Sequence, residues 1–302
     1  MLPHLPGTAN TSTPVVVGSA AFVKMQILMP GETAAPGSAT GKTGTPTART
    51  AGTAFTIIVN AVDAYWNKVP TVTDMVHIAT TDANGVVPAD IALANGTMTF
   101  TNKVTLKTPV TTTTITVTDV TDGAKTADTS PALTVNVGAF VKLQILLTGE
   151  TAAPGTTAGK TGTPTAQVAG ATINVTVNAV DNVWNVITSA TDVVHFASTD
   201  VNADLPANTA LVGGTINLTA TVKTAGSRTI TVTDVTNPAK TNNTSGSVTV
   251  SAGAFVKLQL LLPGETAAAG TATGKTGTPS VASAGTPLAV TVNAVDAYWN
   301  KK

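Results

Sequence analysis

The sequence contains no cysteine and little charge. Among its 302 residues 16 are basic and 16 acidic, so charged residues make up 11% of the chain and the formal net charge is zero. Without cysteine, the chain has no disulfides, no thiol catalysis and no thiolate metal sites. The sparse basic side chains argue against nucleic-acid binding and against a basic membrane-surface helix, since both require a dense positive surface.

Long apolar runs and aromatic side chains are also scarce. The longest apolar stretches are short segments such as 139–147, whereas a membrane-spanning helix needs about 20 apolar residues. Residues 1–20 contain early prolines and no apolar stretch of signal-peptide length, so no secretion signal is recognisable. Aromatic residues amount to 4% of the chain, which predicts a core of small side chains.

Threonine, valine and alanine are abundant instead. β-Branched side chains favour strands because they fit a pleated, half-buried surface. Glutamate and arginine are rare, so little is available to cover the exposed face of a helix. The composition therefore predicts an all-β protein whose solvent face is covered by threonine hydroxyls.

The sequence repeats itself. An Ala-Phe-Val-Lys segment is followed by Gly-Glu-Thr-Ala-Ala, Gly-Lys-Thr-Gly-Thr and Asn-Ala-Val-Asp-x-x-Trp-Asn, in the same order each time. Residues 8–19 align without a gap to 126–137, the end of the first repeat. We therefore divide the chain into a tail with the last strand of a preceding repeat (1–19), a first full repeat (20–137), a second full repeat (138–252) and the first part of a third repeat (253–302).

Each full repeat is predicted to contain about seven short strands. Alternation places Phe55, Ile57 and Val59 on the inner face of one strand, and it places Gln26 and Asn60 on outer faces. Asp-Ala-Asn-Gly, Asn-Gly and Asp-Gly turns separate later strands. Short strands at this density are typical of an immunoglobulin-like β-sandwich, so the predicted architecture is a tandem array of such sandwiches.

Several motifs resemble bacterial immunoglobulin-like repeats of large secreted and cell-surface proteins. They are Asn60-Ala-Val-Asp-Ala-Tyr-Trp-Asn, the strand from Thr73 to Asp82, and Ile115-Thr-Val-Thr-Asp119, with counterparts from Asn178 to Asp234. This chain has Asp-x-x-Trp-Asn where family members often have Asp-x-x-Gly-Asn. The resemblance implies an extracellular stalk, adhesin or fibre on a prokaryotic cell surface, and it implies no catalytic residues.

The segment 30–52 resembles a phosphate-binding loop, Gly37-Ser-Ala-Thr-Gly-Lys-Thr, but has three residues between its glycines where that motif has four. A structureless loop of this length is uncommon. We therefore weigh three interpretations: a solvated loop, a small hairpin, or a contact with a neighbour. Glu32 and Lys42 are expected to form a weak surface ion pair worth about 0–1 kcal/mol.

Aspartates at one repeated position, Asp63, Asp181 and Asp296, each lie four residues before an asparagine. They are candidate calcium ligands, because calcium prefers several oxygen ligands. The competing interpretation, which we favour, is a turn in which aspartate and asparagine bond their own backbone. No other cofactor is expected.

The recurring aromatic and histidine positions have structural interpretations. The tryptophans at Trp66, Trp184 and Trp299 are expected to plug a sandwich end or contact the next domain, with a sugar-binding platform as the weaker alternative. His77 and His195 are expected on strand surfaces, because no second histidine is near in sequence to support zinc binding or a catalytic triad.

The incomplete third repeat predicts self-association, because open sheet edges invite strand pairing with another chain. The strand at 8–19 of one copy is expected to add to residues 253–302 of another, giving a head-to-tail homopolymer. We predict a structural filament or stalk subunit, with an adhesin binding carbohydrate or protein through loops at the sandwich ends as the alternative and an enzyme as unlikely. The candidate interface residues are Val15, Val16, Val17, Phe22, Glu32, Lys42, Phe140, Glu150, Lys160, Phe255, Glu265 and Lys275.

Overall fold

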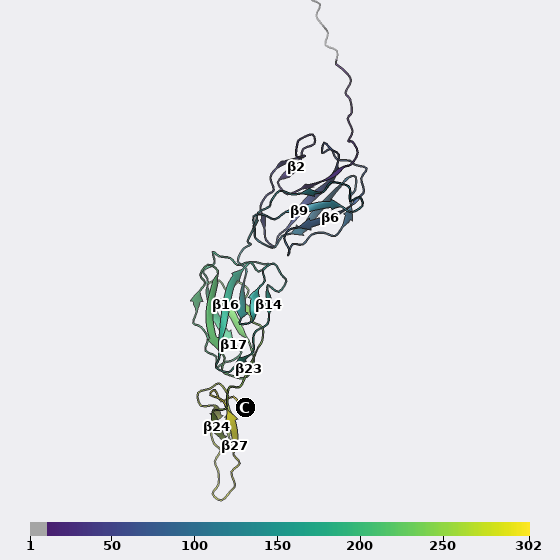
Figure 1. Cartoon of the computed structure of the whole chain (residues 1–302). Coiled ribbons are helices and arrows are strands. Elements are labelled where there is room, and N and C mark those ends of the chain that lie inside the picture. Colours follow the sequence, from purple (N-terminus) through teal and green to yellow (C-terminus); the bar gives the residue numbers. More distant parts are fainter. Residues whose placement is uncertain (1–10) are drawn as a thin grey trace, which may run out of the picture.

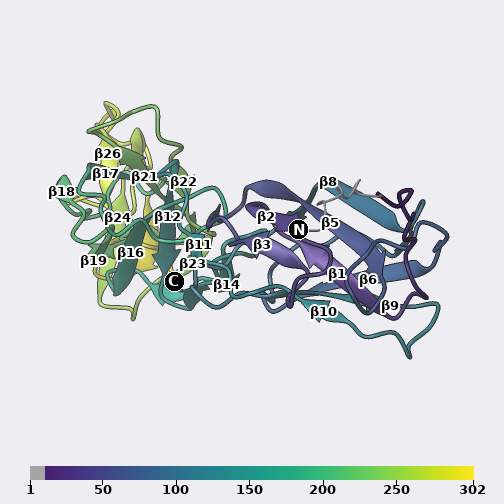
Figure 2. The same ribbon diagram turned by 90° about the horizontal axis from the view of Figure 1, so that it is seen from above.

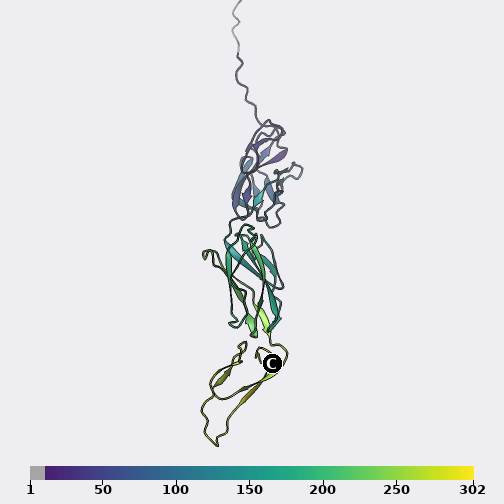
Figure 3. The same ribbon diagram turned by 90° about the vertical axis from the view of Figure 1, so that its left-hand side faces the viewer.

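The computed structural model describes residues 11–302 and shows β units joined end to end in an elongated chain (Figure 1). We call residues 20–137 repeat 1, residues 138–252 repeat 2 and residues 253–302 repeat 3. The side view shows the three units in succession (Figure 3). Seen from above, repeats 2 and 3 overlap while repeat 1 lies to one side (Figure 2), so the chain bends at the first junction.

The part of the chain that the structure describes contains strands and no helix, and hence none that could span a bilayer. The strands of repeat 1 are β1 (Lys24–Leu28), β2 (Glu32–Ala34), β3 (Lys42–Gly44), β4 (Arg49–Thr50), β5 (Ala54–Val62), β6 (Met75–Thr80), β7 (Ile91–Ala92), β8 (Thr97–Thr105), β9 (Ile115–Asp119), β10 (Asp128–Thr129) and β11 (Val135–Asn136). Repeat 2 contains β12 (Lys142–Leu147), β13 (Glu150–Ala152), β14 (Lys160–Gly162), β15 (Gln167–Val168), β16 (Thr172–Val180), β17 (Val193–Ser198), β18 (Thr209–Ala210), β19 (Thr215–Thr221), β20 (Gly226–Arg228), β21 (Ile230–Asp234), β22 (Asn243–Thr244) and β23 (Val248–Ser251). Repeat 3 contains β24 (Lys257–Leu261), β25 (Glu265–Ala267), β26 (Lys275–Gly277) and β27 (Thr291–Val295).

Two antiparallel sheets enclose the core of repeat 1. Their strand orders are β1-β5-β8 and β10-β9-β6-β7, and β11 returns to run parallel to β4. Repeat 2 has the corresponding sheets β12-β16-β19 and β18-β17-β21-β22, while β23 pairs with β15 and β20. Each of these two repeats has its own buried apolar cluster. The prediction of an all-β, immunoglobulin-like sandwich is confirmed.

Alternation within the strands is largely as predicted. Phe55, Ile57 and Val59 of β5 are buried in the core. Gln26 and Asn60 point away from the core as predicted, but they are buried there. The reason is a second layer: the segment between β1 and β4 forms the β2–β3 hairpin, which pairs Glu32 with Gly44 and covers the outer face of the sheet. The hairpin interpretation of this segment is therefore correct.

A chain of hydrogen bonds holds the hairpin on the sheet. Gln26 Nε2 donates to the carbonyl of Gly41 at 2.7 Å, Asn60 Nδ2 donates to Gln26 Oε1 at 2.9 Å, and Thr97 Oγ1 donates to Asn60 Oδ1 at 2.7 Å. The same glutamine–asparagine bond recurs in repeats 2 and 3. Buried amides are costly without partners, so this network fixes the hairpin at one position in every repeat.

Repeat 3 is an open unit in which β24 pairs with β27 and β25 with β26. Leu258 and Leu260 of β24 are 65% and 51% exposed, whereas their counterparts in β12, Leu143 and Ile145, are fully buried. The two faces differ because strands equivalent to β17 and β21 cover β12 in repeat 2, and no such strands cover β24 among the described residues.

Candidate functional site: the repeat junction and the lysine clamp

An aspartate organises the turn that follows the long central strand of each repeat. In repeat 1, Asp63 Oδ1 accepts the backbone N–H groups of Tyr65 and Asn67 at 2.9 Å, and Oδ2 accepts that of Ala20 at 2.9 Å. Burial by itself would raise the pKa of Asp63, but these hydrogen bonds outweigh it and lower the pKa to about 2. The carboxylate therefore stays charged and fixes the chain entering the repeat to the turn.

The same aspartate turn occurs in the other repeats. Asp181 accepts backbone N–H groups from Gly138, Val183 and Asn185. Asp296 accepts the equivalent bonds. These are the bonds expected of the turn interpretation, and no group of three metal-ligating side chains occurs within residues 11–302. Calcium binding at these aspartates stays a prediction.

The tryptophan of each aspartate turn packs against a glycine of the hairpin and lies next to a lysine. Trp66 adopts a left-handed backbone conformation with φ of 69°, and its ring packs against the α-carbon of Gly41, which leaves no room for a Cβ there. Lys24 Nζ lies 3.4 Å from the ring centroid and donates to the carbonyl of Ala64 at 3.1 Å. In repeat 2, burial lowers the pKa of the equivalent Lys142. The ring is thus held between a hairpin glycine and a lysine, and its expected role as a plug for the sandwich end stays a prediction.

The turn of repeat 2 docks onto the end of repeat 1. Val183 packs against the core of repeat 1 beside Gly52. Asn185 Nδ2 donates to the carbonyl of Lys107 at 3.0 Å, and it also donates to Asp181 Oδ2 at 2.9 Å. One asparagine side chain thus links its own aspartate turn to the backbone of the preceding repeat.

The turn of repeat 3 makes the same contacts with repeat 2. Tyr298 occupies the position of Val183 and packs against the core of repeat 2 over Gly170. Asn300 Nδ2 donates to the carbonyl of Lys223 at 2.9 Å, and Asn300 Oδ1 accepts the N–H of Ala225 at 2.7 Å. The expected contact between domains is therefore made by the residues on either side of the tryptophan.

Asparagines in the Asp-Ala-Asn-Gly turn and its counterpart add a second bridge. Asn84 Nδ2 donates to the carbonyl of Pro154 at 3.3 Å across the first junction. Asn202 Nδ2 donates to the carbonyl of Ala269 at 3.2 Å across the second. Each junction is thus held at two points, which restricts rotation of one repeat on the next. Sequence reasoning identified this turn, but not its role as a docking element.

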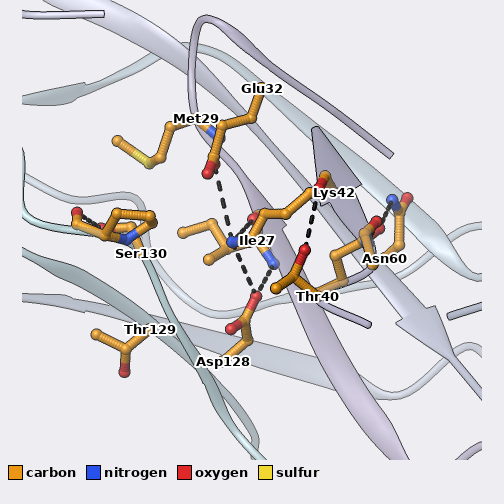
Figure 4. Close-up of polar contacts among 12 residues, drawn as sticks. Ile27, Met29, Glu32, Thr40, Lys42, Asn60, Asp128, Thr129 and Ser130 are labelled. Carbon is orange, nitrogen blue, oxygen red and sulfur yellow. Dashed lines mark hydrogen bonds and ion pairs between the residues drawn. The ribbon is translucent and has the colours of Figure 1, made fainter. Parts of the chain in front are cut away.

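The second feature is a lysine clamp, which we define in repeat 1 as Glu32, Lys42 and Asp128 (Figure 4). Lys42 Nζ lies 3.4 Å from Asp128 Oδ2 and 3.8 Å from Glu32 Oε2. It donates to the carbonyl of Ile27 at 3.0 Å, while Asp128 Oδ2 accepts the N–H of Ile27 at 2.8 Å. The clamp thus provides hydrogen-bond partners for both the N–H and the carbonyl group of Ile27 at the outer edge of β1.

Burial distinguishes the clamp from an ordinary surface ion pair. The side chains of Lys42, Glu32 and Asp128 are 12%, 2% and 16% exposed, so the expected ion pair between Glu32 and Lys42 is present but does not lie on the open surface. The physical reason is that the hairpin folds back onto β1 and presses these side chains against its edge. Asp128 was missed because β10 lies far from the hairpin in sequence.

Repeat 2 has the same clamp with one change, and repeat 3 has its lysine–glutamate pair alone within residues 253–302. Lys160 Nζ lies 2.7 Å from Glu150 Oε1 and 3.5 Å from the carbonyl of Ile145. Asn243 replaces the aspartate, and its Oδ1 accepts the N–H of Ile145 at 3.0 Å. In repeat 3, Lys275 pairs with Glu265 at 2.8 Å. The alignment of Asn243 with Asp128 in β22 and β10 was the sequence signal for this third member.

The other predicted interface residues lie at different places. Phe22 and Phe140 pack against the cores of their own repeats, each near a lysine, whereas Phe255 is 54% exposed. Val15, Val16 and Val17, which were expected in a strand, are exposed and belong to no strand of the described chain. Their assignment to contacts between chains stays a prediction.

The predicted surface histidines are exposed. His77 Nδ1 lies 2.7 Å from Asp90 Oδ1, and His195 Nδ1 lies 2.8 Å from Asn208 Oδ1. Each ring therefore contacts a side chain in the segment that follows its strand within the same repeat. These are ordinary surface contacts on β6 and β17.

A buried acid pair recurs in both full repeats. Asp119 Oδ1 accepts the N–H groups of Thr121 and Asp122, whereas its Oδ2 is buried without a hydrogen-bond donor in the described chain. Burial, followed by the charge of Asp119, raises the pKa of the neighbouring Asp74. In repeat 2, burial and the charge of Asp192 raise the pKa of Asp234.

No known family profile and no curated protein sequence matches the chain. Among solved structures, the adhesin FdeC of Escherichia coli is 16% identical with a TM-score of 0.30, and the match covers 93% of this chain and 77% of that one. Domains 1–6 of the surface-layer protein SbsC are 15% identical with a TM-score of 0.26, covering 94% and 32%. A β-glycosidase of Bacteroides vulgatus is 12% identical with a TM-score of 0.29, and this chain spans 25% of its length. At these TM-scores, the likenesses bear neither on activity nor on partners.

Proposed function

We propose that this protein is a structural component of an extracellular filament or cell-surface stalk of a prokaryote, with no enzymatic activity. The observation that carries the proposal is the junction. Asn185 and Asn300 make the same bond to the backbone of the preceding repeat, and Val183 and Tyr298 fill the same position beside a glycine. Docking contacts that recur at successive junctions are what a stiff spacer requires, because they restrain each repeat on the one before it.

The surface chemistry supports the same role. With charged residues at 11% and a net charge of zero, neighbouring rods repel each other little. Threonine hydroxyls on the exposed strand faces offer hydrogen bonds without a charged field. Both features suit close lateral packing of stalks or filaments.

We propose further that copies assemble head to tail by strand addition. Val15 and Val17 align with Leu133 and Val135, which are buried in repeat 1. They are nevertheless 82% and 88% exposed. The strand β11, which contains Val135, pairs in parallel with β4. Residues 282–283 occupy the β4 position in repeat 3 and pair with no strand among the described residues.

Exposed apolar side chains on repeat 3 provide the acceptor. Leu258, Leu260 and Val292 are more than half exposed, and each aligns with a fully buried residue of repeat 2. A donated strand that placed Val15 and Val17 on this face would bury apolar area at about 25 cal/mol per Å². Because one strand covers only part of the face, we infer that several copies contribute.

The test is negative-stain electron microscopy with analytical ultracentrifugation over a concentration series. Wild type is expected to form filaments with a regular axial repeat. A double variant Val15→Asp and Val17→Asp is expected to stay monomeric, because it places charge on the inward positions. Val16→Asp is the matched control, since Val16 aligns with Thr134, which is only partly buried, and is itself 94% exposed. Separate rods at all concentrations, or equal loss in both variants, would refute strand addition.

The second candidate function is ligand binding by a surface adhesin. A cavity of about 430 Å³ lies between the edges of β7 and β8 in repeat 1, with an apolar wall that includes Ile91, Met98 and Phe100 and a rim that includes Asp90 and Lys103. A carbohydrate or peptide array with wild type and a Met98→Lys variant tests this function. Saturable binding that the variant abolishes would favour the adhesin over the stalk.

A further inference from the structure

In repeat 1, the lysine clamp brings together the three groups required for a spontaneous covalent cross-link, and repeat 2 has an equivalent residue at each position. We propose that Lys42 and Asp128 condense into an intramolecular amide in repeat 1, and that Lys160 and Asn243 do so in repeat 2. Glu32 and Glu150 act as the catalytic acid–base groups. This inference is independent of filament assembly, because every participating residue lies within one repeat.

Geometry places the amine against its electrophile in repeat 1. Lys42 Nζ lies 3.4 Å from Asp128 Oδ2, while the backbone of Ile27 positions both groups by accepting from one and donating to the other. Glu32 is oriented by the N–H of Met29 at 2.9 Å. Reacting groups held in this way reach effective concentrations of roughly 10⁵ M or more, so a condensation that is negligible between free side chains becomes feasible.

The reaction balances without a co-reactant. In repeat 1, Glu32 takes a proton from the Lys42 ammonium, and the Nζ lone pair attacks Cγ of Asp128. Glu32 passes this proton, and then a second proton from the same nitrogen, to the departing oxygen, so that the C–N bond forms, a C–O bond breaks and the oxygen leaves as water. An ammonium and a carboxylate thus become one amide and one water. Condensation also removes a partly buried cation and a partly buried anion, whose desolvation is costly.

The exchange of aspartate for asparagine is explained better by a condensation reaction than by an ion pair. Asn243 cannot form an ion pair with Lys160, yet it occupies the position of Asp128 and accepts the same backbone N–H. Both side chains have an electrophilic γ-carbon bonded to a group that can leave. In repeat 2, the Lys160 ammonium and the Asn243 amide become one substituted amide and one ammonium ion, with Glu150, 2.7 Å from Nζ, moving the proton.

The consequence would be a covalent lock across each full repeat. Lys42 belongs to the hairpin near the start of repeat 1 and Asp128 to a strand near its end, 86 residues further on. A bond between them closes most of the repeat into a ring. Tension applied along the chain would then pass through the cross-link instead of unfolding the sandwich, and the closed loop would restrict the unfolded state.

Intact-mass spectrometry of the denatured full chain tests the inference directly. The expected mass is below the sequence mass by one water and one ammonia. Proteolysis should yield two branched peptides, one joining Lys42 to Asp128 and one joining Lys160 to Asn243. Lys275 should remain unmodified, because no β10-like strand faces it within residues 253–302.

Variants separate the catalytic groups from the bonded ones. Lys42→Arg should restore the water alone, and Glu150→Gln should restore the ammonia alone. Lys24→Arg is the control for changing a lysine of the same repeat that stacks on Trp66 instead. Circular dichroism would verify that each variant folds. The full sequence mass in wild-type protein after prolonged incubation would overturn the inference without reference to any variant.

Discussion

Replacing Asn185 with alanine would test whether the turn couples adjacent repeats. The side chain is 5% exposed and donates one bond to the carbonyl of Lys107 in repeat 1 and one to Asp181 within its own turn. A neutral hydrogen bond contributes roughly 0.5–1.5 kcal/mol and one to a charged group roughly 1.5–3 kcal/mol. The variant is therefore expected to lose about 2–4.5 kcal/mol of unfolding free energy.

Asn67→Ala is the matched control. Asn67 donates to Asp63 in the same turn of repeat 1, but within residues 11–302 its side chain donates to no other repeat. The control should lose only the bond within the turn. The difference between the two variants, about 1 kcal/mol, measures the bond across the junction.

Differential scanning calorimetry and small-angle X-ray scattering would supply the two readouts. For a unit slightly above 100 residues, about 1 kcal/mol corresponds to a difference in Tm of roughly 4 °C. Asn185→Ala should also broaden the distribution of scattering dimensions, because the joint between repeats 1 and 2 loses one of its two attachment points. Equal Tm values and equal scattering for the two variants would show that the asparagine stabilises only its own turn.

Three further predictions concern stability. Tyr298→Ala should destabilise the chain by about 2 kcal/mol because the ring packs on the core of repeat 2, whereas Tyr65→Ala, at a position 69% exposed, should change the Tm little; equal effects in urea unfolding would contradict the junction contact. Burial and the charge of Asp119 raise the pKa of Asp74 in the folded protein, so protonation of Asp74 stabilises the fold as the pH falls through this raised pKa toward about 4. Asp74→Asn should therefore raise the Tm near pH 7 and lose that advantage near pH 4. A difference in Tm that does not depend on pH would contradict this account. Gly159→Ala should cost several kcal/mol, because the residue has φ of 73° and packs against the turn tryptophan; a variant with wild-type thermal unfolding would show that the tryptophan moves freely.

Local patterns determined the class of fold. In β5, side chains at Phe55, Ile57 and Val59 reach the core because consecutive residues of a strand point to opposite faces. The repeats themselves indicated successive units, and the aspartate turn was recognisable because its bonds span only a few residues. These properties depend on neighbours in sequence, so the sequence by itself determined them.

Only the tertiary structure decided which polar residues are buried and what they contact. Gln26 is covered by a hairpin that begins several residues later, and Lys42 meets Asp128 from 86 residues away. Asn300 and Tyr298 contact a different repeat altogether. Alternation along a strand tells which face a side chain is on, but it cannot tell what packs on that face. The clamp and the junction therefore follow from long-range packing, which places a second layer on one sheet and the turn of each repeat against the end of the one before it.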